Sequence, residues 1–434
     1  MTLQKVHVTE HIHLSCIQTD KFKTGVLTLT LPIPIDRKSV IFSAILPEVL
    51  RRGTERYPDM AALNRRLDEL YAACVEIRNT QVGKNLALVL TAEVLDDAYA
   101  ADEDSILDGV MEVLAQMLLH PRMTDGSFDR AIVEQEKRFK RDTFRSAINH
   151  TRILANIRLA ELMSREDDSQ PTLKEREDGL EEINETNLAE FYRRLLSRAP
   201  LEAFYVGTLP PQAVADKLLR FFGEWNAPLK QSLLLPLAEK SAGYCSKVET
   251  MPVSQGKLAM GFRTGVTASQ NSSDYYTALV INEIFGGSPA SKLFMNVREK
   301  MSLCYYCSSS YNQYNGILSV SAGIESANRE RTEKAILEQL EQIRLGNVSE
   351  TEFRAAKVSL ENAYRQIYDN PFELQAFFGN RSLFGLSESI EDCRRGVATV
   401  TPEDVIALAG RVIHDTVFFI EGTLSGEGKE EQDD

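Results

Sequence analysis

Apolar and polar residues alternate over residues 25–31, where Gly25-Val26-Leu27-Thr28-Leu29-Thr30-Leu31 has the period of a half-buried strand. Apolar residues then recur at helical spacing over 40–50, and Gly53 just beyond them is typical of a helix end. The same pattern predicts a second helix over 60–70 and two strands, 72–80 and 86–94, joined by a turn at Gly83. Two long amphipathic helices follow at 104–119 and 127–145, and a late strand lies at 205–207.

The second half repeats this order of elements. A strand is predicted at 257–262, followed by a helix at 275–285 that ends at Gly286-Gly287 and a second helix at 289–300. Two strands, 302–311 and 317–323, are joined through Asn315-Gly316, and two long helices follow at 328–343 and 350–367. Two glycine landmarks keep one spacing, since 286 − 53 and 316 − 83 both equal 233. The repeat predicts an α+β fold of two homologous domains, each a mainly antiparallel sheet packed with helices. We assign the first domain to residues 1–225 and the second domain to residues 251–424, with a linker at 226–250 between them. Residues 425–434 are predicted to be a disordered acidic tail.

Composition narrows the possible functions. Of the 434 residues, 43% are hydrophobic and 26% are charged, which is typical of a globular protein with ample core. The net charge of −14 argues against nucleic acid as a partner, because phosphates would repel the chain. No run approaches the ~18 apolar residues of a membrane span, and the start shows no secretory signal. Six scattered cysteines favour reduced thiols, so we expect a cytoplasmic protein.

Two stretches of the second half carry a resemblance. They are Gly286-Gly287-Ser288-Pro289-Ala290-Ser291-Lys292-Leu293-Phe294 and, after it, Val297-Arg298-Glu299-Lys300 with Leu303-Cys304-Tyr305. The first stretch resembles the glycine loop of the pitrilysin (insulinase) family of zinc peptidases, and the second resembles the Arg/Tyr segment of the same family. In the first half, Arg52-Gly53-Thr54 and residues 128–136 are similar to the segments that flank the family's metal site. The resemblance implies a two-domain clam-shell fold.

The family's zinc motif is absent. Active members carry an inverted motif, H-x-x-E-H, shortly before the Gly-Thr pair, in which two histidines bind zinc and the glutamate activates water. The corresponding positions here hold Ala44, Pro47 and Glu48, and the position of the distal glutamate holds Thr143, with Asp142 adjacent. The resemblance therefore implies no metal site, no cofactor and no catalytic residue on this chain alone.

The Arg/Tyr segment is retained. In the family, this arginine and tyrosine hydrogen-bond the substrate backbone and help to stabilise the oxyanion, from the side of the cleft opposite the zinc. The resemblance implies that Arg298 and Tyr305 do so here, with Gly286, Gly287 and Ser288 also in the substrate-binding segment. In two-chain, processing-type members, one subunit supplies the zinc and the other supplies this pair.

Two hypotheses follow. In the first, the chain is the non-catalytic, substrate-binding subunit of a heteromeric zinc peptidase. Its partner would be a homologous subunit with H-x-x-E-H that holds the zinc, and its substrate would be a peptide or unfolded protein bound as an added strand. In the second, the chain is an inert scaffold or assembly protein of the same fold. An independent hydrolase is not supported, because the sequence has no Gly-x-Ser-x-Gly elbow.

Other residue patterns have plainer interpretations. Arg298 alone would be a solvated charge and Tyr305 an ordinary strand aromatic, and Gly286-Gly287-Ser288 lacks the Lys-Ser/Thr end of a phosphate loop. Cys304 and Cys307 form C-x-x-C, but on a strand they should point to opposite faces, which argues against a redox or metal role. His11 and His13 should share one strand face and could hold a metal only with further ligands. The other candidates are isolated histidines, His120, His150 and His414. Glu134 and Glu136 are predicted to lie on a helix surface.

Overall fold

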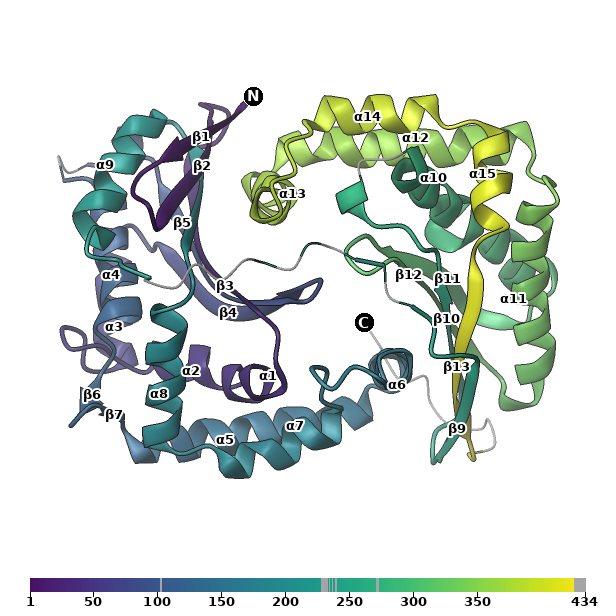
Figure 1. The fold of residues 1–434 in the computed structure, drawn as a ribbon, viewed down its shortest axis with the longest axis horizontal. Coiled ribbons are helices and arrows are strands. Elements are labelled where there is room, and N and C mark those ends of the chain that lie inside the picture. Colours follow the sequence, from purple (N-terminus) through teal and green to yellow (C-terminus); the bar gives the residue numbers. More distant parts are fainter. Residues whose placement is uncertain are drawn as a thin grey trace. The chain divides into compact units, whose positions relative to one another are not determined.

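The structure, a computed structural model, describes residues 1–101, 104–227, 233, 235, 237–238, 240–270 and 273–424. The chain forms two compact units, each built on one sheet packed with helices (Figure 1). Unit 1 comprises Met1–Thr143, Pro171–Leu235 and Ile367–Ser389, and unit 2 comprises Phe144–Gln170, Pro236–Gln366 and Ile390–Asp434. The predicted acidic tail at 425–434 lies outside the described residues, as does part of the predicted linker.

The sheet of unit 1 has six strands in the order β1-β2-β8-β3-β5-β4. Their bounds are Leu3–His7 (β1), Ile12–Gln18 (β2), Thr24–Pro34 (β3), Cys74–Val82 (β4), Asn85–Leu95 (β5) and Leu201–Gly207 (β8). β2 pairs with β8 in parallel, and the other described pairs in this sheet are antiparallel. β3 is central and almost wholly buried, as its run of apolar residues requires.

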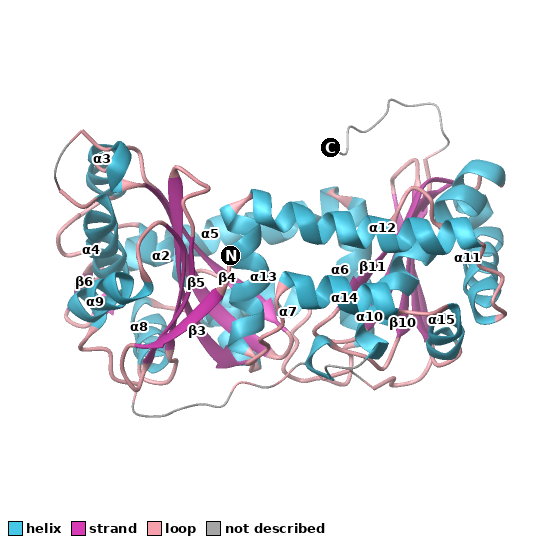
Figure 2. Ribbon diagram, turned by 90° about the horizontal axis from the view of Figure 1, so that it is seen from above, coloured by secondary structure: helices cyan, strands magenta, loops and turns pink. Residues whose placement is uncertain are grey.

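Helices cover both faces of this sheet. They are α1 (Arg37–Ser43), α2 (Leu46–Arg51), α3 (Met60–Glu69), α4 (Ile106–Leu119), most of α5 (Arg130–Ser146), α7 (Leu173–Gly179), α8 (Glu185–Leu196), α9 (Pro211–Phe222) and α13 (Pro371–Leu383), beside a two-residue hairpin of β6 (Met123–Thr124) and β7 (Ser127–Phe128). Figure 2 shows α3, α4 and α9 on one side of the sheet and α13 on the other.

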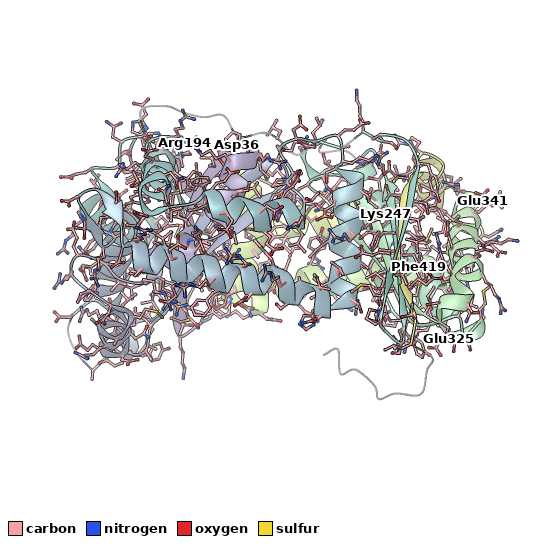
Figure 3. The ribbon with its side chains drawn as sticks, turned by 90° about the horizontal axis from the view of Figure 1, so that it is seen from below. Asp36, Arg194, Lys247, Glu325, Glu341 and Phe419 are labelled. Atoms are coloured by element: carbon pink, nitrogen blue, oxygen red, sulfur yellow. The ribbon has the colours of Figure 1, made fainter. Side chains whose placement is uncertain are left out.

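The sheet of unit 2 has the order β11-β12-β10-β13-β9. Its strands are β9 (Cys245–Met251), β10 (Gly256–Arg263), β11 (Cys304–Asn312), β12 (Ile317–Ile324) and β13 (Ile413–Gly422). β9 pairs with β13 in parallel, and the other described pairs are antiparallel. Phe419 on β13, labelled in Figure 3, is among the largest fully buried side chains of this core.

The helices of unit 2 also cover both sheet faces. They are α6 (Thr151–Met163), α10 (Ser273–Asn282), α11 (Arg329–Arg344), α12 (Glu350–Gln366), α14 (Ile390–Thr399) and α15 (Pro402–Ala409). The predicted helices at 275–285 and 289–300 are not regular α-helices throughout. Glu283–Gly287 and Leu293–Lys300 are π-helical, and this rarer winding is found frequently at functional sites.

The two sheets share one topology. Strands β4, β5, β3, β8 and β2 of unit 1 correspond in order and direction to β11, β12, β10, β13 and β9 of unit 2, including the one parallel pair in each. The predicted α+β fold with mainly antiparallel sheets packed with helices is therefore confirmed. The division into 1–225, 226–250 and 251–424 stays a prediction about duplicated sequence. No described helix is both long and apolar enough to cross a membrane.

Each unit is completed by a helix from the other half of the sequence. α6 lies in the first half but packs on β10 and β13, while α13 lies in the second half but packs on β3 and β8. α6 fits closely, because a Cβ atom at Gly261 on β10 would collide with Sδ of Met163. Arg263 anchors the end of α6 by donating to the carbonyl of Met163, at 2.5 Å. The same guanidinium forms a buried ion pair with Asp415, Nε to Oδ2 at 3.0 Å.

The predicted helix at 40–50 is two short helices. α1 begins at the cap Asp36 (labelled in Figure 3) and ends at Ser43, and α2 begins at Leu46. Pro47 causes the break, because proline has no N–H to donate and its ring conflicts with the carbonyl four residues earlier, that of Ser43. The side-chain amide of Asn79 donates to this carbonyl instead.

Candidate functional site

The positions of the missing zinc motif straddle the break between α1 and α2. Ala44 is the C-cap of α1, whereas Pro47 and Glu48 lie in the first turn of α2. Two histidines that bind one metal ion from a helix must lie one turn apart on a continuous helix. The backbone over 44–48 does not provide this continuity, so the departure from the motif extends beyond the side chains.

Ion pairs occupy this region. Oε1 of Glu48 accepts a hydrogen bond from Nζ of Lys140 at 2.8 Å, and Oε1 of Glu136 accepts from the Arg52 guanidinium at 2.5 Å. Glu136 is only 4% exposed, so its prediction as a surface residue is wrong, and its burial is balanced by Arg52. Glu134 pairs with Lys137 at 2.9 Å.

Thr143 provides no carboxylate in this region. Its hydroxyl donates to the carbonyl of Phe139 in its own helix, at 2.9 Å. Within the described part of the chain, no group of three or more His, Cys, Asp or Glu side chains is placed to hold a metal ion.

The glycine loop is a close-packed turn. A Cβ atom at Gly286 would lie 2.6 Å from the backbone nitrogen of Ser309 on β11, so only glycine allows this approach. Gly287 is exposed and ends the first π-helical segment, and the hydroxyl of Ser288 donates to the carbonyl of Glu283 at 3.2 Å. Glu283 is half-buried, which raises the pKa of its carboxyl.

Arg298 and Tyr305 lie on two neighbouring elements. Arg298 is in the second π-helical segment, which packs against β11, and its side chain is 39% exposed. The guanidinium lies over the ring of Phe294, 4.7 Å from its centroid, and its Nε is 3.6 Å from Oε1 of Glu299. Tyr305 is near the start of β11 and is 53% exposed. The charge of Arg298 acts on Cys304, the residue just before Tyr305, so the arginine and the tyrosine lie in one neighbourhood.

A β-bulge sets the direction of Tyr305. Cys304 pairs with Ile324 and Tyr306 with the adjacent Gly323, so Tyr305 is an extra residue with no register partner on β12. A bulge bends the strand and re-aims its side chains. Ser302, three residues before Tyr305, has a φ of +50°, which marks the same irregular entry into β11.

The bulge also overturns the interpretation of the C-x-x-C pair. Because one residue is extra, Cys304 and Cys307 lie on the same side of β11, and the S–H of Cys307 donates a hydrogen bond to the sulfur of Cys304. The prediction that the two side chains point to opposite faces is therefore wrong. Nothing in the alternation of residues reveals a bulge, and sequence reasoning accordingly missed this contact.

The predicted histidine pair is not formed as expected. His11 precedes β2, whereas His13 lies on it, and Nδ1 of His13 is 2.8 Å from Oε1 of Glu202 on the neighbouring β8. The ring of His13 also contacts His7, at 5.6 Å between centroids. His414 is packed among aromatic rings, and burial lowers the pKa of its imidazole.

A polar groove of about 420 Å³ lies beside β11 within unit 2. Serine pairs line it from two strands, Ser308 opposite Ser321 and Ser310 opposite Ser319, and Arg152 of α6 lines the other side. The Arg152 guanidinium stacks on the ring of Tyr306, 4.3 Å from its centroid. This wall can offer many hydroxyl groups to a polar ligand.

Known proteins with this fold identify the class. A family model described as the peptidase M16 inactive domain matches residues 182–360. Over 416 residues, 96% of each chain, the protein is 29% identical to YmfF of Bacillus subtilis strain 168, a probable inactive metalloprotease. A conserved protein from Enterococcus faecalis V583 has the same fold, with a TM-score of 0.89 at 24% identity over 98% of this chain and 100% of that one. The peptidase M16 inactive domain from Pseudomonas fluorescens has a TM-score of 0.77 at 16% identity over 99% and 100%.

The fold and the match to an inactive peptidase domain define the class of this protein, a homologue of metallopeptidases. Residues 182–360 match the inactive domain of peptidase M16 (pitrilysin) proteins, and the whole chain is a homologue of a probable inactive metalloprotease.

Proposed function

We propose that this chain is the non-catalytic, substrate-binding subunit of a heteromeric zinc peptidase of the cytoplasm. It supplies Arg298 and Tyr305 to the active site of a homologous partner, which carries H-x-x-E-H and holds the zinc. The observation that carries the proposal is the exposed Tyr305 on a bulged strand beside Arg298, in a chain whose own metal positions hold an ion pair.

The geometry of the two side chains supports this role. Both reach solvent, and both are donors: the Arg298 guanidinium offers a planar fork of N–H groups, and the Tyr305 phenol offers one O–H. Such donors stabilise an oxyanion when they are held where its charge develops. The π-helical segment under Arg298 and the bulge under Tyr305 are both irregular backbone, which is common at functional sites.

The position of β11 supports a peptide as the substrate class. β11 is the end strand of its sheet, so one of its edges faces away from β12. An extended peptide can add to such an edge through main-chain hydrogen bonds, with little demand on its sequence. Tyr305, at the beginning of β11, would lie alongside a peptide bound in this way.

Reconstitution tests the proposal. The purified chain is mixed with a homologous H-x-x-E-H chain from the same genome, and hydrolysis of a quenched fluorescent peptide library is measured with and without a chelator. Chelator-sensitive cleavage that neither chain gives alone is expected. The double variant Arg298→Ala/Tyr305→Phe should co-purify with the partner but lose turnover. The exposed Arg395 and Tyr244 provide the matched control, Arg395→Ala/Tyr244→Phe, which should keep turnover. Full turnover with Arg298→Ala/Tyr305→Phe would reject the proposal and favour the hypothesis that the chain is an inert scaffold.

A further inference from the structure

Cys304 and Cys307 form a thiol pair because of the β-bulge in β11. The register runs from Cys304 opposite Ile324 to Tyr306 opposite Gly323 and Cys307 opposite Ala322, which leaves Tyr305 as the extra residue. In a regular strand, residues three apart face opposite ways. With one residue inserted, the two cysteines share a side, and the S–H of Cys307 donates to the sulfur of Cys304.

The two thiols differ in exposure and acidity. Cys304 is half-buried, whereas Cys307 is 4% exposed. The hydrogen bond from Cys307 lowers the pKa of Cys304 below that of a free thiol, against the effect of partial burial, and the charge of Arg298 lowers it further. The same hydrogen bond and its burial raise the pKa of Cys307. An accessible, more acidic thiol beside a buried, less acidic thiol is the arrangement of an attacking and a resolving cysteine.

We propose that Cys304 and Cys307 are a redox-active pair that closes to a reversible intramolecular disulfide by exchange with a small-molecule or protein disulfide. The Cys304 thiolate attacks one sulfur of that disulfide, which forms a mixed disulfide and releases one thiolate. Cys307 then gives up its proton and attacks the Cys304 sulfur, which expels the second thiolate. Two protein thiols are oxidised by two electrons, and the exogenous disulfide is reduced to two thiols that take up the protons.

This inference goes beyond the proposed function and does not depend on it, because it needs no partner subunit and no peptide. The disulfide would tie the two ends of the segment that carries Tyr305, and it would remove the acidic thiol beside Arg298. The pair is therefore a modification site at the bulge.

Peptide mapping tests the proposal on the full reduced chain. The probe is bis(2-hydroxyethyl) disulfide, and remaining thiols are alkylated in acid before digestion with trypsin, which releases residues 301–329 with both cysteines. We expect this peptide to lose the mass of two hydrogen atoms and to take up no alkyl group. Cys74, which is exposed, provides the internal control and should carry only the mixed disulfide.

Single variants separate the two roles. Cys307→Ser, or Cys307→Ala if serine is not tolerated in the buried position, should accumulate the mixed disulfide on Cys304, because no resolving thiol remains. Cys304→Ser should leave the buried Cys307 unmodified over the time in which Cys74 reacts completely. The proposal is overturned if the wild-type peptide stays reduced when Cys74 has reacted, or if a mixed disulfide on Cys304 persists beside an intact Cys307.

Discussion

Nζ of Lys140 on α5 lies 2.8 Å from Oε1 of Glu48 on α2, so a protein ammonium stands beside the residue at the second histidine position of the zinc motif. The other carboxylate oxygen of Glu48 is buried and has no hydrogen-bond partner among the described residues. Lys140 is therefore the charge that balances Glu48 in this part of unit 1.

Loss of Lys140 should destabilise the fold modestly. Lys140→Ala leaves Glu48 without its cation, and because both side chains are partly exposed we expect the free energy of unfolding to fall by about 1 kcal/mol. Urea unfolding would measure this fall. In the background of Glu48→Gln the same change should cost less, and equal costs in the two backgrounds would show that the pair does not couple.

Zinc should not bind tightly to the isolated chain. Positions 44–48 hold Ala44, Pro47 and Glu48 across a helix break, and tight zinc sites need three or four well-placed ligands. After incubation with zinc and dialysis, elemental analysis should find far less than one ion per chain, and a chelator should leave the melting temperature unchanged. One zinc per chain together with a chelator-induced fall in melting temperature would contradict this prediction.

Changes at Tyr305 and Arg298 should act on different kinetic constants of the reconstituted peptidase. Tyr305→Phe should lower kcat by ~10²–10³, the cost of losing one oxyanion donor in a hydrolase. Arg298→Ala should chiefly raise KM, and Arg298→Lys should recover only part of the loss, because an ammonium cannot replace a planar fork. Steady-state kinetics at saturating subunit would separate these effects. The control Tyr244→Phe should leave both constants unchanged.

The buried Arg263–Asp415 pair should make unit 2 sensitive to acid. Burial alone would raise the pKa of Asp415, but hydrogen bonds from Ser241, Thr416 and Arg263 outweigh it, so the folded pKa lies below the usual value. The stabilisation is therefore present above the unfolded pKa of ~3.9 and is lost as the pH falls through the folded pKa. Asp415→Asn should lower stability at pH 7 by about 3–5 kcal/mol, because Arg263 stays buried without its carboxylate.

Urea midpoints measured from pH 7 down to pH 3 would check both parts of this prediction. The wild type should lose stability more steeply in acid than Asp415→Asn does. Parallel profiles would mean that Asp415 contributes nothing to the acid sensitivity.

Gly261→Ala should weaken the packing of α6 on its sheet. The added methyl group would collide with Sδ of Met163, and overpacking of this kind costs about 1–3 kcal/mol. Gly410→Ala is the control, because a Cβ there meets ordinary contacts at 3.5 Å and beyond. Thermal unfolding of the two variants gives the comparison, and equal melting temperatures would show that α6 moves aside without cost.

The strands were the most predictable part of the fold. The alternation over 25–31 predicts the core of β3, and the turn glycines Gly83 and Gly316 mark the hairpins that the structure shows. Periodicity also predicts helices with an apolar face, but it does not say which sheet a helix packs against. The sequence therefore did not predict that α6 packs on the sheet of unit 2 and α13 on the sheet of unit 1.

The irregular backbone of the candidate site could not be predicted from the pattern of apolar and polar residues. The apolar spacing over 289–300 is similar for an α-helix and a π-helix, so the pattern did not reveal the wider winding under Arg298. The bulge at Tyr305 inserts one residue without any change in composition, and this reversed the facing of Cys307. By contrast, Pro47 was visible in the sequence, and its effect on the helix at 40–50 could have been anticipated.

The exchange of α6 and α13 has a genetic consequence. A nonsense mutation just after codon 366 would leave every strand of unit 1 encoded, yet the polypeptide would lack α13, which packs on β3 and β8. A gene fragment that begins after codon 163 would likewise encode every strand of unit 2 but lack α6. A gene fission between the two halves of this sequence would therefore yield two products, each with all the strands of its sheet but without the helix from the other half that packs on that sheet.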